Sequence, residues 1–79
     1  MMLERMKEII AEQLSLDTTD SITPETKFMD DLGADSLDLF ELAMALEEAY
    51  NVEIPSEDLE SIITVQDVMD YLKGKGVED

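Results

Sequence analysis

The sequence predicts an all-α protein, a small four-helix bundle with one short helix (the third) and a long loop between the first and second helices. Three observations predict this fold. Apolar residues recur at helical spacing in four segments, helix caps and turn residues separate these segments, and no segment alternates as a strand would. The 79 residues have room for one domain, which we expect to span residues 1–79.

The first helix is marked by apolar residues that recur on one helix face, Leu3, Met6, Ile10 and Leu14. We expect it to end near residues 16–17. A polar loop, residues 17–35, follows, and Thr23-Pro24-Glu25 within it has the form of a helix cap and first turn. This form predicts a short helical turn there, and we expect Phe28 and Leu32 to hold the rest of the loop to the core.

The second helix is predicted from Ser36 to Tyr50. Asp35 is placed to cap it, Asp38 puts negative charge in the first turn, and Asn51 is suited to end it. Its core face follows the spacing of a buried helix stripe and consists of Leu39, Leu42, Ala43, Leu46 and Tyr50.

A third, short helix is expected after Pro55, with Ser56 as its cap. We expect it to carry Leu59, Ile62 and Ile63. Thr64 then caps a fourth helix, because Thr64-Val65-Gln66-Asp67 has the form of a capping box. The buried face of this helix is predicted to be Val65, Val68, Met69 and Leu72, and Gly74 and Gly76 are expected to end it.

Charge limits the function. The 21 Asp and Glu stand against five Lys and Arg and give a formal net charge of −16. Such a surface repels nucleic acid and anionic membranes, attracts basic protein patches and divalent cations, and favours a monomer through self-repulsion. The absence of Cys and His excludes disulfides, thiolate nucleophiles and the usual zinc sites. No apolar run approaches the roughly 20 residues of a membrane span, so we expect a cytoplasmic protein without membrane insertion.

The second helix carries more apolar residues than its core face needs. Leu37, Phe40 and Met44 form a second stripe, roughly 140° from the first by helical rotation. Covering by a neighbouring element is one explanation. An apolar patch bordered by Glu41, Glu47 and Glu48 is also typical of a surface that docks a basic partner, and we favour that interpretation. Ser36 lies at the start of the same patch and is not needed as a cap, since Asp35 can serve.

The segment around Ser36 resembles the attachment motif of acyl carrier proteins. The motif residues are Asp31-Leu32-Gly33-Ala34-Asp35-Ser36-Leu37 with Asp38 and Glu41-Leu42. The resemblance extends over nearly the whole chain, through Phe28, Met44-Ala45-Leu46-Glu47-Glu48, Glu53-Ile54-Pro55 and Thr64-Val65-Gln66-Asp67. Phe40 departs from the family pattern, which has a smaller aliphatic residue there, often Val.

The resemblance implies that a holo-synthase transfers 4′-phosphopantetheine from coenzyme A to the Ser36 oxygen in a magnesium-dependent reaction. The arm would then carry acyl groups as thioesters between the ketoacyl synthases, reductases, dehydratases and acyltransferases of fatty-acid synthesis. Asp35 and Asp38 would help to position the synthase and a transient Mg²⁺. The implied docking residues are Asp35, Leu37, Asp38, Phe40, Glu41, Met44, Glu47 and Glu48.

Other functions remain as alternatives. A carrier of polyketide, aminoacyl or D-alanyl cargo would share the serine and the bundle. A calcium-binding loop is disfavoured, because no register of residues 17–35 places the Gly and Glu that an EF-hand requires. We expect no enzyme activity, since carboxylates on exposed helix faces of so small a domain lack a cleft that would raise their pKa.

Overall fold

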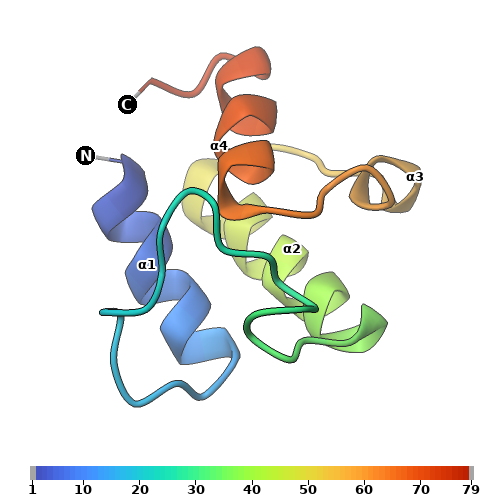
Figure 1. Ribbon diagram of the computed structural model, residues 1–79. Helices are drawn as coiled ribbons and strands as arrows, with labels where there is room; N and C mark the ends of the chain where they lie inside the picture. The colour runs from blue at the N-terminus through green and yellow to red at the C-terminus, as the bar shows by residue number, and fades with distance from the viewer. Residues whose placement is uncertain (1, 79) are drawn as a thin grey trace.

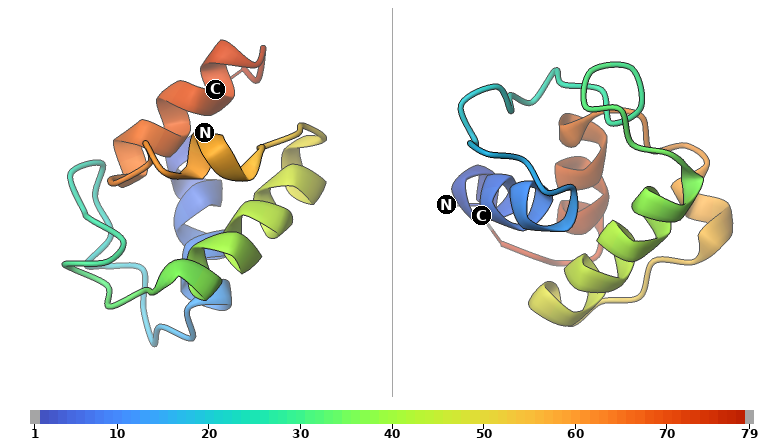
Figure 2. Two further views of the ribbon diagram at one scale, coloured as in Figure 1. Left: turned by 90° about the vertical axis from the view of Figure 1, so that its right-hand side faces the viewer. Right: turned by 90° about the horizontal axis from the view of Figure 1, so that it is seen from below.

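The computed structural model describes residues 2–78 and contains four helices (Figure 1). They are α1 (Met2–Gln13), α2 (Ser36–Tyr50), α3 (Ser56–Leu59) and α4 (Val65–Gly74). α1 and α3 lie on opposite sides of the molecule, with α2 and α4 between them (Figures 1 and 2). No strand forms within the described residues, so the all-α prediction is confirmed.

One hydrophobic core joins α1, α2, α4 and the long loop. Met6 and Ile10 of α1 and Val65 and Leu72 of α4 are fully buried in it. The predicted core face of α2 is confirmed: Leu42, Ala43 and Leu46 are buried, and Leu39 and Tyr50 pack partly against them. α3 has no buried residue, so it stands at the edge of the core.

α1 ends at Gln13, a few residues before the predicted end. The backbone of Ser15 takes the left-handed conformation with φ of 57°, and the amide of Leu16 donates to the carbonyl of Ala11 at 2.8 Å. This arrangement closes the helix, because such a residue reverses the chain and satisfies one of the last helical carbonyls. The sequence does not mark this helix end, because Ser is a poor marker of a residue in the left-handed conformation.

The long loop is attached to the core by Phe28, as predicted, and also by Ile22, which the sequence analysis did not assign. Leu32 packs partly against the core. A single turn forms at Thr23-Pro24-Glu25, as predicted, and the amide of Thr26 donates to the carbonyl of Thr23 at 3.0 Å. No helix follows this turn.

α3 is shorter than predicted, and its predicted cap is wrong. Pro55 occupies the cap position with no side-chain hydrogen bond, and Ser56 is already the first helical residue. The helix ends before Ile62 and Ile63. The carbonyl of Ile63 instead accepts the amide of Phe28 at 3.0 Å, next to an isolated antiparallel bridge between Lys27 and Thr64. Pairing with the long loop therefore competes with continuation of the helix.

The capping box of α4 is confirmed. The amide of Asp67 donates to the Thr64 hydroxyl at 3.1 Å, and the amide of Thr64 donates to the Asp67 carboxylate at 3.0 Å. Hydrogen bonds from the backbone amides of Thr64 and Ile63 lower the pKa of Asp67, because they favour the charged carboxylate. α4 ends at Gly74, and Gly76 after it has a φ of 93°, which suits a residue without Cβ.

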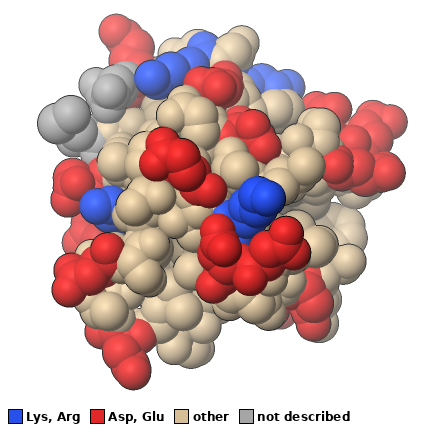
Figure 3. Space-filling view, viewed as in Figure 1, with Lys and Arg blue, Asp and Glu red and all other residues tan. Residues whose placement is uncertain are grey.

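Acidic side chains are spread over the face seen in Figure 3 and gather at its right-hand edge, over α3. Among the described residues only one ion pair forms, between Lys7 and Glu4 at 3.8 Å. Most of the acidic charge is therefore not balanced by a local cation. None of the helices in residues 2–78 is long and apolar enough to cross a membrane.

Candidate functional site

Ser36 is the first residue of α2, and it is exposed. The cap is Asp35, as predicted, so the Ser36 side chain is not used to start the helix. The Asp35 carboxylate accepts the amide of Asp38 at 2.9 Å, and the Asp38 carboxylate accepts the amide of Asp35 at 3.1 Å. Within residues 2–78 the Ser36 hydroxyl forms no hydrogen bond, so it is available to react.

The turn before Ser36 is held by its own backbone. The amide of Gly33 donates to the carbonyl of Met29 at 3.1 Å, and the amide of Ala34 donates to the carbonyl of Phe28 at 2.9 Å. Gly33 has a φ of 72°, a conformation that other residues rarely adopt. Because Phe28 and Ala34 are buried, the turn is fixed to the core and holds Ser36 at a defined position.

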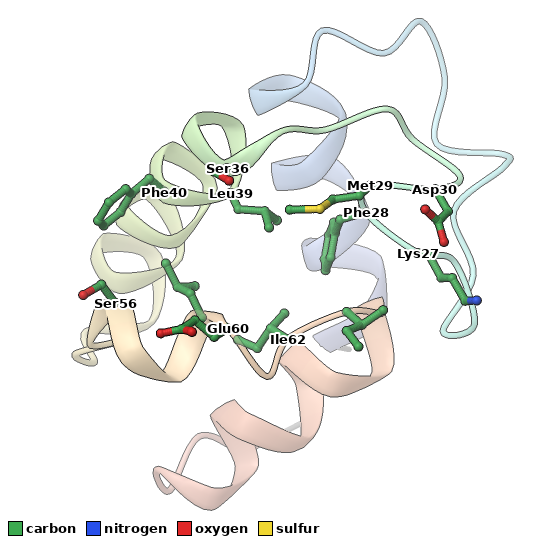
Figure 4. Close-up of a pocket in the computed structure, with 12 residues that line it drawn as sticks. Lys27, Phe28, Met29, Asp30, Ser36, Leu39, Phe40, Ser56, Glu60 and Ile62 are labelled. Atoms are coloured by element: carbon green, nitrogen blue, oxygen red, sulfur yellow. The ribbon is translucent and has the colours of Figure 1, made fainter.

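A pocket of about 410 Å³ opens beside Ser36, and we call it the Ser36 pocket. It lies between the loop around Met29, the first turns of α2, α3 and the connection to α4. Figure 4 shows Phe40 and Ser56 at one end and Lys27 and Asp30 at the other. Its apolar lining consists of Phe28, Met29, Leu39, Phe40, Leu59, Ile62 and Ile63.

This pocket was not predicted from the sequence. Its walls come from segments far apart in the chain, and the bridge between Lys27 and Thr64 brings two of them together. Met29 and Ile63 are 50% and 57% exposed, although each follows a buried residue. Two adjacent apolar residues in each of these loop segments indicate that one of them lies outside the core. Without knowledge of the pairing, the sequence does not show that the outer residues line the same pocket.

No other element of the described residues 2–78 covers the second stripe of α2. Leu37, Phe40 and Met44 are 64%, 49% and 56% exposed, and we call them the outer patch. Glu41 and Glu48 are exposed beside it. The structure therefore excludes the explanation that a neighbouring segment covers the stripe.

Glu47 differs from the other two glutamates that were expected to border the patch. It is half-buried, and its carboxylate accepts the backbone amide of Ile54 at 2.8 Å. Since Ile54 is buried and lies just before Pro55, this bond ties the connection between α2 and α3 to α2. Glu47 therefore stabilises the connection between α2 and α3, in addition to any contact with a partner.

No group of three or more Asp or Glu side chains within residues 2–78 is arranged to hold a metal ion. Asp35 and Asp38 each use one carboxylate oxygen for the reciprocal cap. The second oxygen of each remains for a cation that arrives with another molecule. The two residues therefore suit a shared ion better than a resident one.

Comparison with known proteins agrees with this geometry. The family model described as phosphopantetheine attachment site matches residues 4–72. An acyl carrier protein of Syntrophobacter fumaroxidans is 62% identical over 68 residues, which cover 86% of this chain and 83% of that protein. The solved structure of a candidate acyl carrier protein from Mycobacterium tuberculosis superposes with a TM-score of 0.85 at 35% identity, covering 95% of this chain and 99% of the other.

These matches cover most of the chain, and the fold they share is the one described above. The group that the family carries is 4′-phosphopantetheine. An exposed serine at a helix start, next to an apolar pocket, fits a phosphate ester with an acyl-bearing arm. The chain belongs to the acyl carrier protein family, whose members are carriers that bear a phosphopantetheine attachment site.

Proposed function

We propose that this protein carries acyl chains of fatty-acid synthesis as thioesters on a 4′-phosphopantetheine arm attached to the Ser36 oxygen. The observation that carries the proposal is the position of Ser36, exposed at the start of α2 and at the edge of the Ser36 pocket. Seven of the twelve residues that line the pocket are apolar, so it suits a hydrocarbon chain better than a polar cargo.

Attachment at Ser36 requires an accessible oxygen and a favourable place for the phosphate. The backbone amides at the start of α2 supply partial positive charge there. The carboxylates of Asp35 and Asp38 oppose a second anion at close range. We propose that a Mg²⁺ ion bound with coenzyme A offsets this repulsion during transfer by a holo-synthase, using the carboxylate oxygens that the cap leaves over.

We propose that the outer patch, with Glu41 and Glu48 beside it, docks partner enzymes that present Lys and Arg. Between Phe28 and Leu72 the chain has no Lys or Arg, so the segment that carries the outer patch adds no cation of its own that would repel a basic surface. The apolar side chains would then supply the desolvated centre of the contact. The proposed partners are the ketoacyl synthases, reductases, dehydratases and acyltransferases of fatty-acid synthesis, besides the holo-synthase.

The cargo is tested by charging the arm-bearing protein in parallel reactions. We expect a malonyl transferase and the elongation enzymes of fatty-acid synthesis to load and extend it, and ligases for D-alanine or other amino acids to leave it unloaded. Intact mass measures each product. Efficient aminoacylation without malonyl loading would contradict the fatty-acyl assignment in favour of the alternative cargoes, while keeping Ser36 as the attachment residue.

A further inference from the structure

Phe40 belongs to both parts of the site. It is one of the exposed residues of the outer patch, and it also lines the Ser36 pocket. The other two residues of the outer patch, Leu37 and Met44, do not line the pocket. Phe40 lies one helical turn after Ser36, so both face the same side of α2.

The Phe40 ring is half-exposed, and Figure 4 shows it at the same end of the pocket as Ser56. An apolar chain in the pocket would bury more of this ring, because contact between the chain and the ring removes apolar surface of each from water. A partner on the outer patch would cover the same exposed half of the ring, since the ring belongs to that patch. The acyl chain and the partner cannot both bury the whole apolar surface of the ring.

We propose that an acyl chain in the Ser36 pocket and a partner on the outer patch compete for the Phe40 ring, so that Phe40 couples cargo to docking in this protein. The inference rests on the proposed carrier function. Binding linkage is reciprocal: a sequestered chain weakens docking by the same factor by which docking weakens sequestration. Phe40 acts as a positioning residue here, because it takes no part in the covalent chemistry.

The test compares two forms of the protein, one with the bare arm and one with an octanoyl chain attached to the arm through a stable amide. A ketoacyl synthase of fatty-acid synthesis, with its active site blocked so that the chain cannot enter it, is the binding partner. We expect the octanoyl form of the wild type to bind about fivefold more weakly than the bare-arm form, a ratio at the low end of measured couplings. In Phe40→Ala this ratio should fall to about one.

Met44→Ala is the matched control, since Met44 belongs to the outer patch but not to the pocket. It should weaken binding of both forms and keep the wild-type ratio. Phe40→Leu, which retains an apolar side chain, should give a ratio between those of the wild type and Phe40→Ala. Circular dichroism of each variant checks that the helices are intact.

The outcomes separate the inference from the function it rests on. Failure of the wild type to accept the arm, measured by intact mass, would contradict the carrier function and the inference together. Normal loading with the same ratio in the wild type and Phe40→Ala, or a ratio of one in the wild type, would contradict the coupling and leave the carrier function standing.

Discussion

The Tyr71 hydroxyl donates a hydrogen bond to the carboxylate of Asp58, and this bond joins α4 to α3. α3 is held in place by this bond, by Leu59, which packs partly against the core, and by the bond between Glu47 and the amide of Ile54. Because α3 forms one wall of the Ser36 pocket, the two hydrogen bonds help to set the shape of that pocket.

The bond to Asp58, together with partial burial and the charges of Asp58 and Glu47, raises the pKa of Tyr71 to about 12. Its ordinary value is near 10. A raised folded-state pKa means that the bond stabilises the protein fully below about pH 10 and that this stability is lost as the pH rises toward 12. An ultraviolet difference titration of the wild type against Tyr71→Phe should therefore show ionisation near pH 12.

In Asp58→Asn the same titration should move down toward pH 10, because the variant lacks the negative charge that holds the proton. Near neutral pH, Tyr71→Phe should lower the free energy of unfolding by about 1 kcal/mol. Ionisation of Tyr71 near pH 10 in the wild type would contradict the hydrogen bond between the two residues.

The capping box of α4 predicts a pH-dependent contribution from Asp67. Its pKa is lowered in the folded protein, so its contribution is present above the ordinary Asp value of about 3.9 and is lost as the pH falls below it. Asp67→Ala should cost about 1 kcal/mol of unfolding free energy at neutral pH and much less near pH 2. Urea denaturation at both pH values measures this.

Asp70→Ala is a suitable control for Asp67→Ala, because Asp70 is exposed on the same helix and its side chain bonds, within residues 2–78, only to the Gln66 side chain. It should cost less at neutral pH. Equal costs for the two variants at both pH values would show that the Asp67 cap does not stabilise α4.

The unbalanced negative charge predicts stabilisation by ions. With a net charge of −16 and a single ion pair among the described residues, repulsion between carboxylates opposes the folded state. Added sodium chloride or millimolar magnesium should raise the melting temperature, because both screen the repulsion. Thermal denaturation that is indifferent to both would contradict this account of the charge.

Charge reversal beside the outer patch should slow transfer of an acyl group to a partner. Glu41→Lys is expected to lower kcat/KM for a partner enzyme by about tenfold, since it removes an attraction and adds a repulsion. Glu12→Lys makes the same change on the exposed surface of α1 and should have a small effect. Similar losses in both variants would show that only the total charge matters.

Met44→Asp tests the apolar centre of the same surface. The exposed position should accept the new charge without unfolding α2, while the buried centre of a docked complex should not. We expect acyl transfer to slow while the circular dichroism spectrum stays unchanged. Wild-type transfer kinetics would remove Met44 from the docking surface.

The fold was most predictable where a local signal and the core agreed. α2 has the predicted bounds because Asp35 caps it and Asn51, with φ of 56°, ends it. The capping box of Thr64 and Asp67 was equally clear. Each of these signals lies within a few residues of the helix end that it marks.

The parts that the sequence did not predict depend on contacts between distant segments. α3 was predicted to include Ile62 and Ile63, but the pairing of Ile63 with Phe28 ends it sooner. The Ser36 pocket needs the same pairing, so it could not be read from helical spacing. The hydrogen bond of Glu47 could not be predicted either, because its partner is the backbone amide of Ile54 and not a side chain.

The most direct test of the central claim is the mass of the protein after incubation with coenzyme A, Mg²⁺ and a phosphopantetheinyl transferase. The wild type should gain the mass of one phosphopantetheine, and Ser36→Ala should gain none. Ser56→Ala should gain it as the wild type does, although Ser56 is also an exposed serine at a helix start beside the same pocket. An unmodified wild type, or a modified Ser36→Ala, would contradict attachment at Ser36.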